Sequence, residues 1–219
     1  MTDKTRIRTY PGDAITIRYD ATRCMHAAMC VNSRLKEVFK LGDKPWIDPS
    51  GATADDIADV VEQCPSGALQ YERHDGGPDE AVPDNRATPE PNGALYVRGE
   101  LTLRDAQGRE IARGTRLALC RCGYSEDKPF CDRSHDRVGF DDDGTVDDGF
   151  GPKGLEPRGP LVITVSHNGP LSVEGRLAVA SADGRSVVYR NNTALCRCGR
   201  SRYKPFCDGS HHGVRLDEA

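Results

Sequence analysis

Two stretches of the 219-residue sequence carry the same potential metal ligands at the same spacing. Each contains Cys-x-Cys, then eight residues, a third Cys, three residues and a His, and the second copy starts 76 residues after the first. The candidate ligands are Cys120, Cys122, Cys131 and His135 in the first copy and Cys196, Cys198, Cys207 and His211 in the second. Metal coordination fixes its ligands and leaves the residues between them free to vary. The pattern predicts a metal or iron–sulfur site in each copy.

Within each copy the ligands form two pairs. Cys-x-Cys places two thiolates close enough to bind one iron, and Cys-x3-His can bind a second. Tetrahedral zinc also accepts three Cys and one His, but zinc fingers usually space their paired cysteines by two to four residues. A single His among thiolates raises the reduction potential, and its protonation can release the metal, a sensitivity that an inert structural cluster would not need. The spacing therefore favours a redox or sensing site over a zinc finger or a structural cluster.

Both copies resemble the CDGSH iron–sulfur (NEET) family, in which a Ser and a Pro-x-Cys-Asp-Gly-Ser-His run accompany the ligands. The resemblance covers about residues 89–216 and implies a [2Fe–2S] cluster bound by the four ligands of each copy. Family members pair two such units around a two-fold axis, which implies here a monomer with an internal pseudo-two-fold pair. The first copy departs from the pattern at Arg133, where the second has Gly209. Arg133 would strain a loop that needs positive φ, and its charge would raise the potential of the first cluster.

Three further cysteines, Cys24, Cys30 and Cys64, lie near the amino terminus. With Pro65 they resemble the Cys-x2-Cys-x2-Cys…Cys-Pro pattern of bacterial ferredoxins, with Ala27 in place of the middle cysteine. About residues 14–73 are similar to the divergent single-cluster ferredoxin domain often associated with CDGSH modules. The resemblance implies a [3Fe–4S] cluster, or a [4Fe–4S] cluster whose fourth iron takes His26, water or an exogenous ligand. The alternatives are a surface role for His26, which we favour, and three buried free cysteines in a small α/β module.

The elements that must position these ligands follow from the repeat. Of 44 positions in 92–135, 23 are identical in 168–211 without a gap, so two copies of one domain are expected. Alternating apolar residues predict strands that turn at Gln107-Gly108 and Asp183-Gly184. In each copy this β element leads into the ligand loop, where Asp132 and Asp208 can cap a short helix next to each His.

The amino-terminal segment predicts a mixed module with strands at 14–19 and 68–71 and helices at 31–39 and 53–63. Thr53 and Asp56 form a capping-box pattern. The expected fold class is α+β, a small ferredoxin-like module followed by two β-rich CDGSH modules. Its divisions are a domain at 1–73, a linker at 74–91, a CDGSH domain at 92–140, a linker at 141–160 and a CDGSH domain at 161–219. The acidic run Asp141–Asp143 is interpreted as solvated linker charge.

Composition excludes several classes of function. Only 37% of residues are hydrophobic and 6% aromatic, which favours small modules that need a metal to complete their fold. The net charge of −4 provides no basic field for nucleic acid or anionic lipid. No secretory signal or membrane-length apolar run is seen, and an odd count of nine cysteines favours reduced thiols. A soluble, cytoplasmic protein is expected.

The function expected from these sites is one-electron transfer by a three-cluster iron–sulfur protein that exchanges electrons with a redox protein or enzyme. Two alternatives remain, delivery of clusters or redox and pH sensing, and service as the accessory redox subunit of an enzyme on another chain. The sequence contains no nucleotide-binding loop and no catalytic triad. Independent catalysis is therefore not expected.

Overall fold

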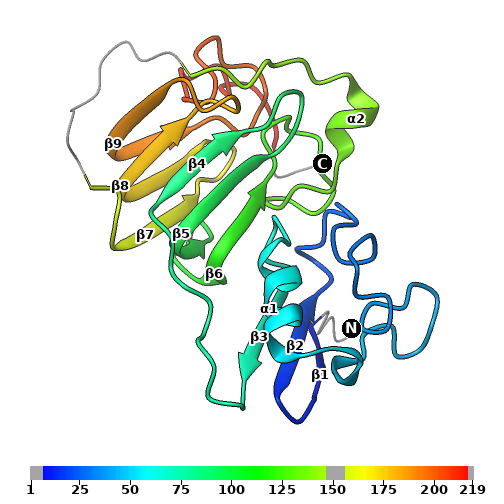
Figure 1. Ribbon diagram of the computed structural model, residues 1–219. Coiled ribbons are helices and arrows are strands. Elements are labelled where there is room, and N and C mark those ends of the chain that lie inside the picture. The colour runs from blue at the N-terminus through cyan, green and yellow to red at the C-terminus, as the bar shows by residue number, and fades with distance from the viewer. Residues whose placement is uncertain (1–6, 147–155, 217–219) are drawn as a thin grey trace. The chain divides into compact units, whose positions relative to one another are not determined.

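A computed structural model of the chain describes residues 7–146 and 156–216 (Figure 1). It divides into two compact units, Met1–Ala81 and Val82–Ala219. Both are rich in β-strands, and the helices are few and short. Within the described ranges, no helix is long and apolar enough to cross a membrane.

The first unit is built on a three-stranded antiparallel sheet. Its strands are β1 (Ile7–Tyr10), β2 (Ile15–Asp20) and β3 (Leu69–Arg73), in the spatial order β1-β2-β3. Ile15 and Ile17 alternate along β2 and are almost fully buried, as expected for a strand with one face on the core. The two strands expected in this segment are confirmed, and β1 is an additional edge strand.

Helix α1 (Ala54–Glu62) follows a short 3-10 turn, η1 (Pro49–Gly51), and buries Ile57 and Val61 in the core of the first unit. Thr53 caps α1, because its hydroxyl accepts the backbone N–H of Asp56 at 3.2 Å and donates to the Asp56 carboxylate at 2.8 Å. The expected helix and its cap by Thr53 are confirmed, with the Asp56 carboxylate bonded to the Thr53 hydroxyl.

The helix expected at 31–39 does not form. Ser33 explains the interruption, since its hydroxyl donates to Cys30 O at 2.6 Å and accepts the N–H of Leu35 at 3.2 Å. These side-chain bonds compete with helical backbone bonds. The segment forms isolated turns, and Val38 and Phe39 still supply the buried side chains that produced the helical pattern.

The second unit is a six-stranded sheet (Figure 1). Its strands are β4 (Arg86–Pro89), β5 (Leu95–Arg104), β6 (Glu110–Leu119), β7 (Pro160–Val165), β8 (Leu171–Ala180) and β9 (Val187–Leu195). The antiparallel pairs β5–β6 and β8–β9 turn where the sequence predicts. Leucines, isoleucine and valines from both repeats fill a single core. The two repeats are therefore packed as one body.

Strands β4 and β7 each pair with both repeats. Strand β4 is antiparallel to β5 and parallel to β8, whereas β7 is antiparallel to β8 and parallel to β5. Each strand thus precedes its own repeat in sequence and also borders the other repeat. The segment 74–91, expected to be a linker, therefore contains a strand of the sheet, because β4 has hydrogen-bonding partners on both sides.

The segment 141–160 also differs from the expected linker. Val146 is 3% exposed and belongs to the core of the second unit, while residues 147–155 lie outside the described part of the chain. The Asp142 carboxylate is only 8% exposed and forms an ion pair with the buried guanidinium of Arg121. The interpretation of this aspartate as solvated charge is wrong, because a buried guanidinium requires a counter-charge.

Candidate metal centres

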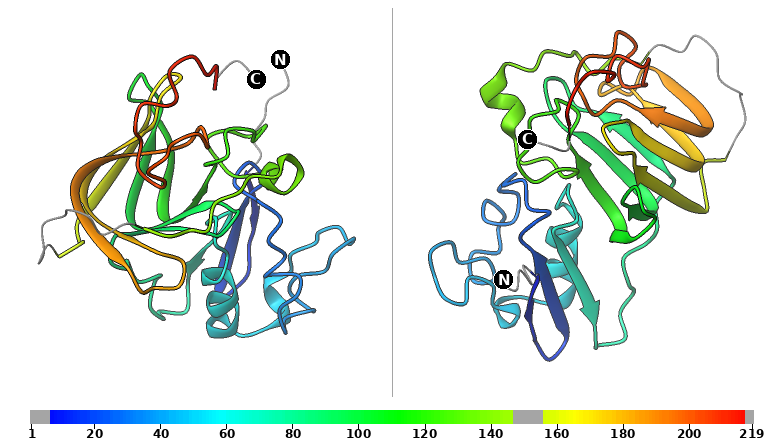
Figure 2. Two further views of the ribbon diagram at one scale, coloured as in Figure 1. Left: turned by 90° about the horizontal axis from the view of Figure 1, so that it is seen from above. Right: turned by 180° about the vertical axis from the view of Figure 1, so that it is seen from behind.

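The two ligand loops, residues 120–136 (first loop) and 196–212 (second loop), continue directly from β6 and β9. In the first loop a short antiparallel bridge joins Leu119 to Phe130, with Cys120 N bonded to Pro129 O at 2.9 Å and Cys131 N to Ala118 O at 3.0 Å. The second loop repeats this bridge between Leu195 and Phe206. Each bridge returns the chain so that the third cysteine lies beside the first two. Figure 2 shows both loops at the same end of the second unit.

The structure brings the predicted ligands together as pairs. The sulfurs of Cys120 and Cys122 are 3.6 Å apart, and those of Cys196 and Cys198 are also 3.6 Å apart. Nδ1 of His135 lies 3.4 Å from the Cys131 sulfur, and the matching second-loop distance, from His211 Nδ1 to the Cys207 sulfur, is 3.3 Å. Within the described residues, no three Cys, His, Asp or Glu side chains converge as one metal ion would require.

The two sites differ in burial. All four candidate ligands of the first loop are 3–6% exposed. In the second loop Cys196 and Cys198 are equally buried, but Cys207 and His211 are half-buried. The sequence repeat gives no sign of this difference. The second site is therefore more accessible to solvent and to partner molecules.

The two thiols of the Cys120–Cys122 pair have very different pKa values. A hydrogen bond from Cys122 lowers the pKa of Cys120 to about 6, while the same bond and burial raise the pKa of Cys122 above its usual range. Burial also raises the pKa of Cys131 to about 12. Two of the sulfurs accept backbone hydrogen bonds. Tyr124 N–H donates to the Cys122 sulfur at 3.5 Å, and Arg133 N–H donates to the Cys131 sulfur at 3.4 Å. Such N–H donors stabilise metal-bound thiolates.

The residues that follow the ligands differ between the loops. Arg133 has φ +69° where Gly209 has φ +88°, so the position does need a left-handed backbone, as expected. The Arg133 guanidinium bonds the Asp136 carboxylate at 2.9 Å, and the other oxygen of Asp136 lies 3.3 Å from His135 Nε2. In the second loop the ring of His212 lies against that of His211, with centroids 4.5 Å apart. Sequence reasoning missed the contact between Asp136 and His135.

The helix expected beside each His forms only in the first loop, as α2 (Ser134–Val138). Asp132 and Asp208 both accept the N–H two residues ahead, at 2.8 and 2.9 Å, so the expected side-chain bonds form in both loops. After Gly209 the second loop continues as separate turns. Gly213, which stands at the position of Arg137 within α2, has positive φ and so interrupts the right-handed helical path.

Buried arginines anchor both loops to the sheet. Arg121, between Cys120 and Cys122, donates from Nε to Gly93 O at 2.8 Å and from Nη2 to Glu90 O, and it pairs with Asp142. Arg197 makes the equivalent bonds to Gly169 O and Ser166 O, both at 2.7 Å. Both Cys-x-Cys motifs contain an Arg between their cysteines. This repeated Arg was the sequence signal for the anchoring role, which was not predicted.

Replacing Arg121 with Met is expected to lower the free energy of unfolding by about 3–5 kcal/mol, because it leaves the buried Asp142 carboxylate without its nearest counter-charge. Denaturant titration of the two proteins measures this difference. The control is Arg137→Met, since the Arg137 side chain is 68% exposed and its Nη2 atom lies 3.4 Å from the Glu126 carboxylate. Its effect should stay below about 1 kcal/mol. Equal losses in both variants would contradict the anchoring role of Arg121.

The amino-terminal cysteines lie around one cavity of the first unit. Cys24, Cys30 and Cys64 line it together with Ala27 and largely apolar neighbours that include Met25, Trp46 and Leu69. His26 borders the cavity but is exposed. Burial and a hydrogen bond to Cys24 raise the pKa of Tyr19 above its usual range, and Cys64 lies 3.7 Å from the Ser66 hydroxyl. Three thiols around an apolar cavity, with hydroxyl groups beside two of them, fit a cluster site. Tyr19 and Ser66 were not predicted.

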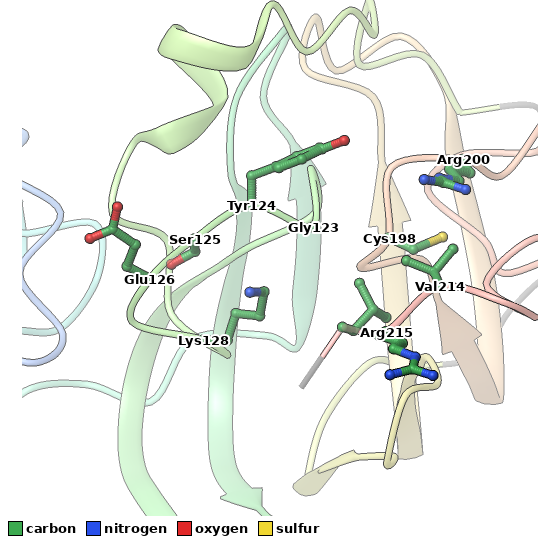
Figure 3. A pocket seen from close by; sticks show the side chains of 10 residues that line it. Gly123, Tyr124, Ser125, Glu126, Lys128, Cys198, Arg200, Val214 and Arg215 are labelled. Carbon is green, nitrogen blue, oxygen red and sulfur yellow. The ribbon is translucent and has the colours of Figure 1, made fainter. Parts of the chain in front are cut away.

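A second cavity, of about 190 Å³, lies between the two ligand loops (Figure 3). Gly123 and Lys128 line it from the first loop, Cys198 and Arg200 from the second, and Arg215 from the chain that follows. In Figure 3 the loop with Gly123 and Tyr124 faces the loop with Cys198. The two candidate sites therefore adjoin a common junction.

Comparisons with known proteins identify the domains that carry these candidate sites. Residues 10–74 match the family model described as a divergent 4Fe-4S mono-cluster domain. Residues 92–136 and 168–212 each match the model for the iron-binding zinc finger of CDGSH type. The uncharacterized protein YjdI of Escherichia coli strain K12 is 39% identical over 67 residues, which cover 31% of this chain and 86% of YjdI. YjdI of E. coli O157:H7 matches equally well. No solved structure matches the chain significantly.

The matched segments contain all eleven candidate ligands. The amino-terminal match covers the three cysteines around the cavity of the first unit, and each CDGSH match covers one ligand loop. The chain is therefore an iron–sulfur protein with two tandem CDGSH-type iron-binding domains and an amino-terminal divergent 4Fe-4S mono-cluster domain.

Proposed function

We propose that the chain transfers single electrons and holds a [2Fe–2S] cluster in each CDGSH loop and a [3Fe–4S] or [4Fe–4S] cluster in its amino-terminal unit. The observation that carries the proposal is the arrangement of each loop's ligands as two pairs. When bound, such a cluster supplies a centre that accepts and returns one electron. The chain contributes the ligands, the N–H donors to their sulfurs and the burial that excludes water.

The pairs fit a two-iron centre better than a single zinc ion. A tetrahedral metal with bonds of about 2.3 Å to sulfur places its two sulfurs about 3.8 Å apart. The observed separation of 3.6 Å between Cys120 and Cys122 is close to this value. Mononuclear zinc would require all four ligands around one point, and in the described part of the chain even three do not converge. The ligand geometry therefore supports two metals per loop.

The amino-terminal site is proposed to use three cysteines. Ala27 occupies the position at which a ferredoxin would supply another thiolate, and it lines the cavity. The exposed His26 borders the same cavity. Its ring supplies one possible fourth ligand, and water or an exogenous ligand remain the others. A [3Fe–4S] cluster needs no fourth ligand.

We further propose that the two CDGSH domains pair within the chain, which would act as a monomer. The reciprocal strand pairing of β4 and β7 supports this arrangement, because each repeat completes the sheet of the other. The proposed partner is a redox protein or an enzyme on another chain, with no independent catalysis here. A monomeric mass by light scattering at micromolar concentration is the expected result, and a dimeric mass would contradict it.

Cluster delivery is the second candidate, and the half-buried Cys207 and His211 favour it, because an accessible cluster can be passed on. Incubation of the reduced holoprotein with an apo-ferredoxin at neutral pH distinguishes the two functions. An electron carrier should retain its clusters. Quantitative transfer of the clusters to the apo-ferredoxin would contradict electron transfer and support cluster delivery as the function.

Anaerobically purified protein is expected to contain about seven or eight iron atoms and a similar amount of acid-labile sulfide per chain. EPR spectroscopy before and after reduction should resolve two [2Fe–2S] signals and a separate amino-terminal cluster. A colourless protein that contains zinc and no sulfide would exclude the proposal. Cys24→Ala serves as the matched variant, because it should remove only the amino-terminal signal.

A further inference from the structure

The two ligand loops touch each other through their backbones. A Cβ atom placed on Gly123 would lie 3.1 Å from Cys198 O and 3.3 Å from Cys198 Cα. A Cβ atom on Gly199 would lie 2.8 Å from Cys122 O. Each glycine follows one ligand cysteine and contacts the equivalent cysteine of the other loop. The contact is therefore reciprocal. A side chain at Gly199 would force a displacement of the facing loop, and one at Gly123 would press against it.

This contact fixes how far apart the two sites can be. Consecutive Cα atoms are 3.8 Å apart, so the Cα atoms of Cys122 and Cys198 lie within about 9 Å of each other. Asp142 adds a second connection, since its carboxylate pairs with Arg121 of the first loop and lies 3.8 Å from Lys204 Nζ of the second. This carboxylate is 8% exposed, so solvent screens the connection only weakly. The two sites are held at a short and constant separation.

The two sites differ in how closely a partner protein can approach them. The first-loop ligands are all buried, whereas Cys207 and His211 of the second loop are partly exposed. A partner therefore approaches the second site more closely than the first. The charge of the loops also distinguishes the two sites. The first loop carries three Lys or Arg and four Asp or Glu, whereas the second carries four Lys or Arg and one Asp. The positive second loop favours an added electron.

We infer that the two CDGSH sites exchange electrons within the chain across the reciprocal contacts Gly123–Cys198 and Gly199–Cys122, so that the second site is the entry and exit for the buried first site. The inference rests on the proposed presence of [2Fe–2S] clusters. In the exchange one electron leaves a reduced site and reduces the oxidised site beside it, and no bond forms or breaks. The first electron comes from an external one-electron donor.

The first test is EPR spectroscopy of the holoprotein reduced with dithionite. Two unpaired spins held this close should split or broaden each other's signals when both sites are reduced, and the effect should be much weaker at half reduction, when few molecules are doubly reduced. Two signals that simply add, without interaction, would overturn the inference and leave the proposed clusters intact. Absence of [2Fe–2S] signals would instead contradict the proposed function.

The second test follows reduction kinetics with a protein donor, reduced plant-type ferredoxin. A Cys207→Ala/His211→Ala variant, which lacks the two half-buried ligands of the second site, should lose the fast phase of first-site reduction. The mirror variant, Cys131→Ala/His135→Ala, should retain the fast phase at the second site. First-site reduction at the wild-type rate without the second site would overturn the inference.

A matched pair of glycine variants tests the contact itself. Gly199 and Gly184 have φ of +75° and +72°, so alanine strains both backbones similarly. An added methyl group would meet Cys122 O at Gly199 but finds nothing within 4 Å at Gly184. Gly199→Ala should weaken the spin interaction while Gly184→Ala preserves it. If the two variants changed the spin interaction equally, the contact at Gly199 would have no role in electron exchange between the sites.

Discussion

A His211→Cys variant is expected to keep its cluster and to lower the reduction potential of the second site by on the order of 100–300 mV. The change replaces a neutral imidazole with a thiolate, whose negative charge disfavours the reduced, more negative state of a cluster. Iron–sulfur centres with His ligands lie several hundred millivolts above comparable centres with Cys alone. Potentiometric titration followed by EPR measures the shift directly.

His212→Ala provides the control for this experiment. Its ring lies against that of His211, with centroids 4.5 Å apart, but His212 is exposed and stands outside the proposed ligand set. Removing it should leave the second potential close to its wild-type value. An unchanged potential in His211→Cys would exclude His211 as a ligand.

The second site is expected to be reduced before the first, with the two potentials separated by tens of millivolts. The second loop has an excess of three positive charges, whereas the first has an excess of one negative charge. A unit charge about 8 Å from a cluster contributes about 2 kcal/mol at an effective dielectric constant of 20, and exposure to solvent and salt reduces this value. Titration of the holoprotein gives the two potentials, and removal of one site's ligands assigns them.

This order reverses the expectation from Arg133 alone. The Arg133 guanidinium bonds Asp136 at 2.9 Å, and the same carboxylate lies beside His135, so the pair adds little net charge at the first site. Asp136→Asn should release the charge of Arg133 and raise the first potential. A first site that is reduced before the second in the wild type would show that local hydrogen bonds outweigh the charge of the loops.

The ligands could be predicted from sequence because coordination constrains residue type and spacing together. The strands before each ligand loop were predictable for a similar reason, since burial on one face of a sheet enforces alternation. Strand β4 was not, because Arg86–Pro89 is short and its pairing depends on two partners far away in sequence. The helix predicted at 31–39 does not form. The hydrophobic pattern reflects the burial of Val38 and Phe39, but it does not reveal the hydrogen bonds of the Ser33 side chain that interrupt a helix.

The environment of the sites was the least predictable part. The sequence repeat suggests equivalent centres, yet the Cys207–His211 pair is more exposed than Cys131–His135. Burial of Asp142 could not be foreseen either, because three consecutive aspartates usually indicate a solvated segment. Both features depend on which segments pack over the loops, and local sequence carries no information about that packing.

The reciprocal pairing of β4 and β7 also has a consequence for assembly. If the two repeats were separate chains, the same parallel pairs, β4 with β8 and β5 with β7, would join two subunits and would weaken on dilution. In one chain the pairing is intramolecular, and a short tether sets an effective concentration in the millimolar range. The site junction should therefore remain assembled at any cellular abundance, even when only a few copies of the protein are present.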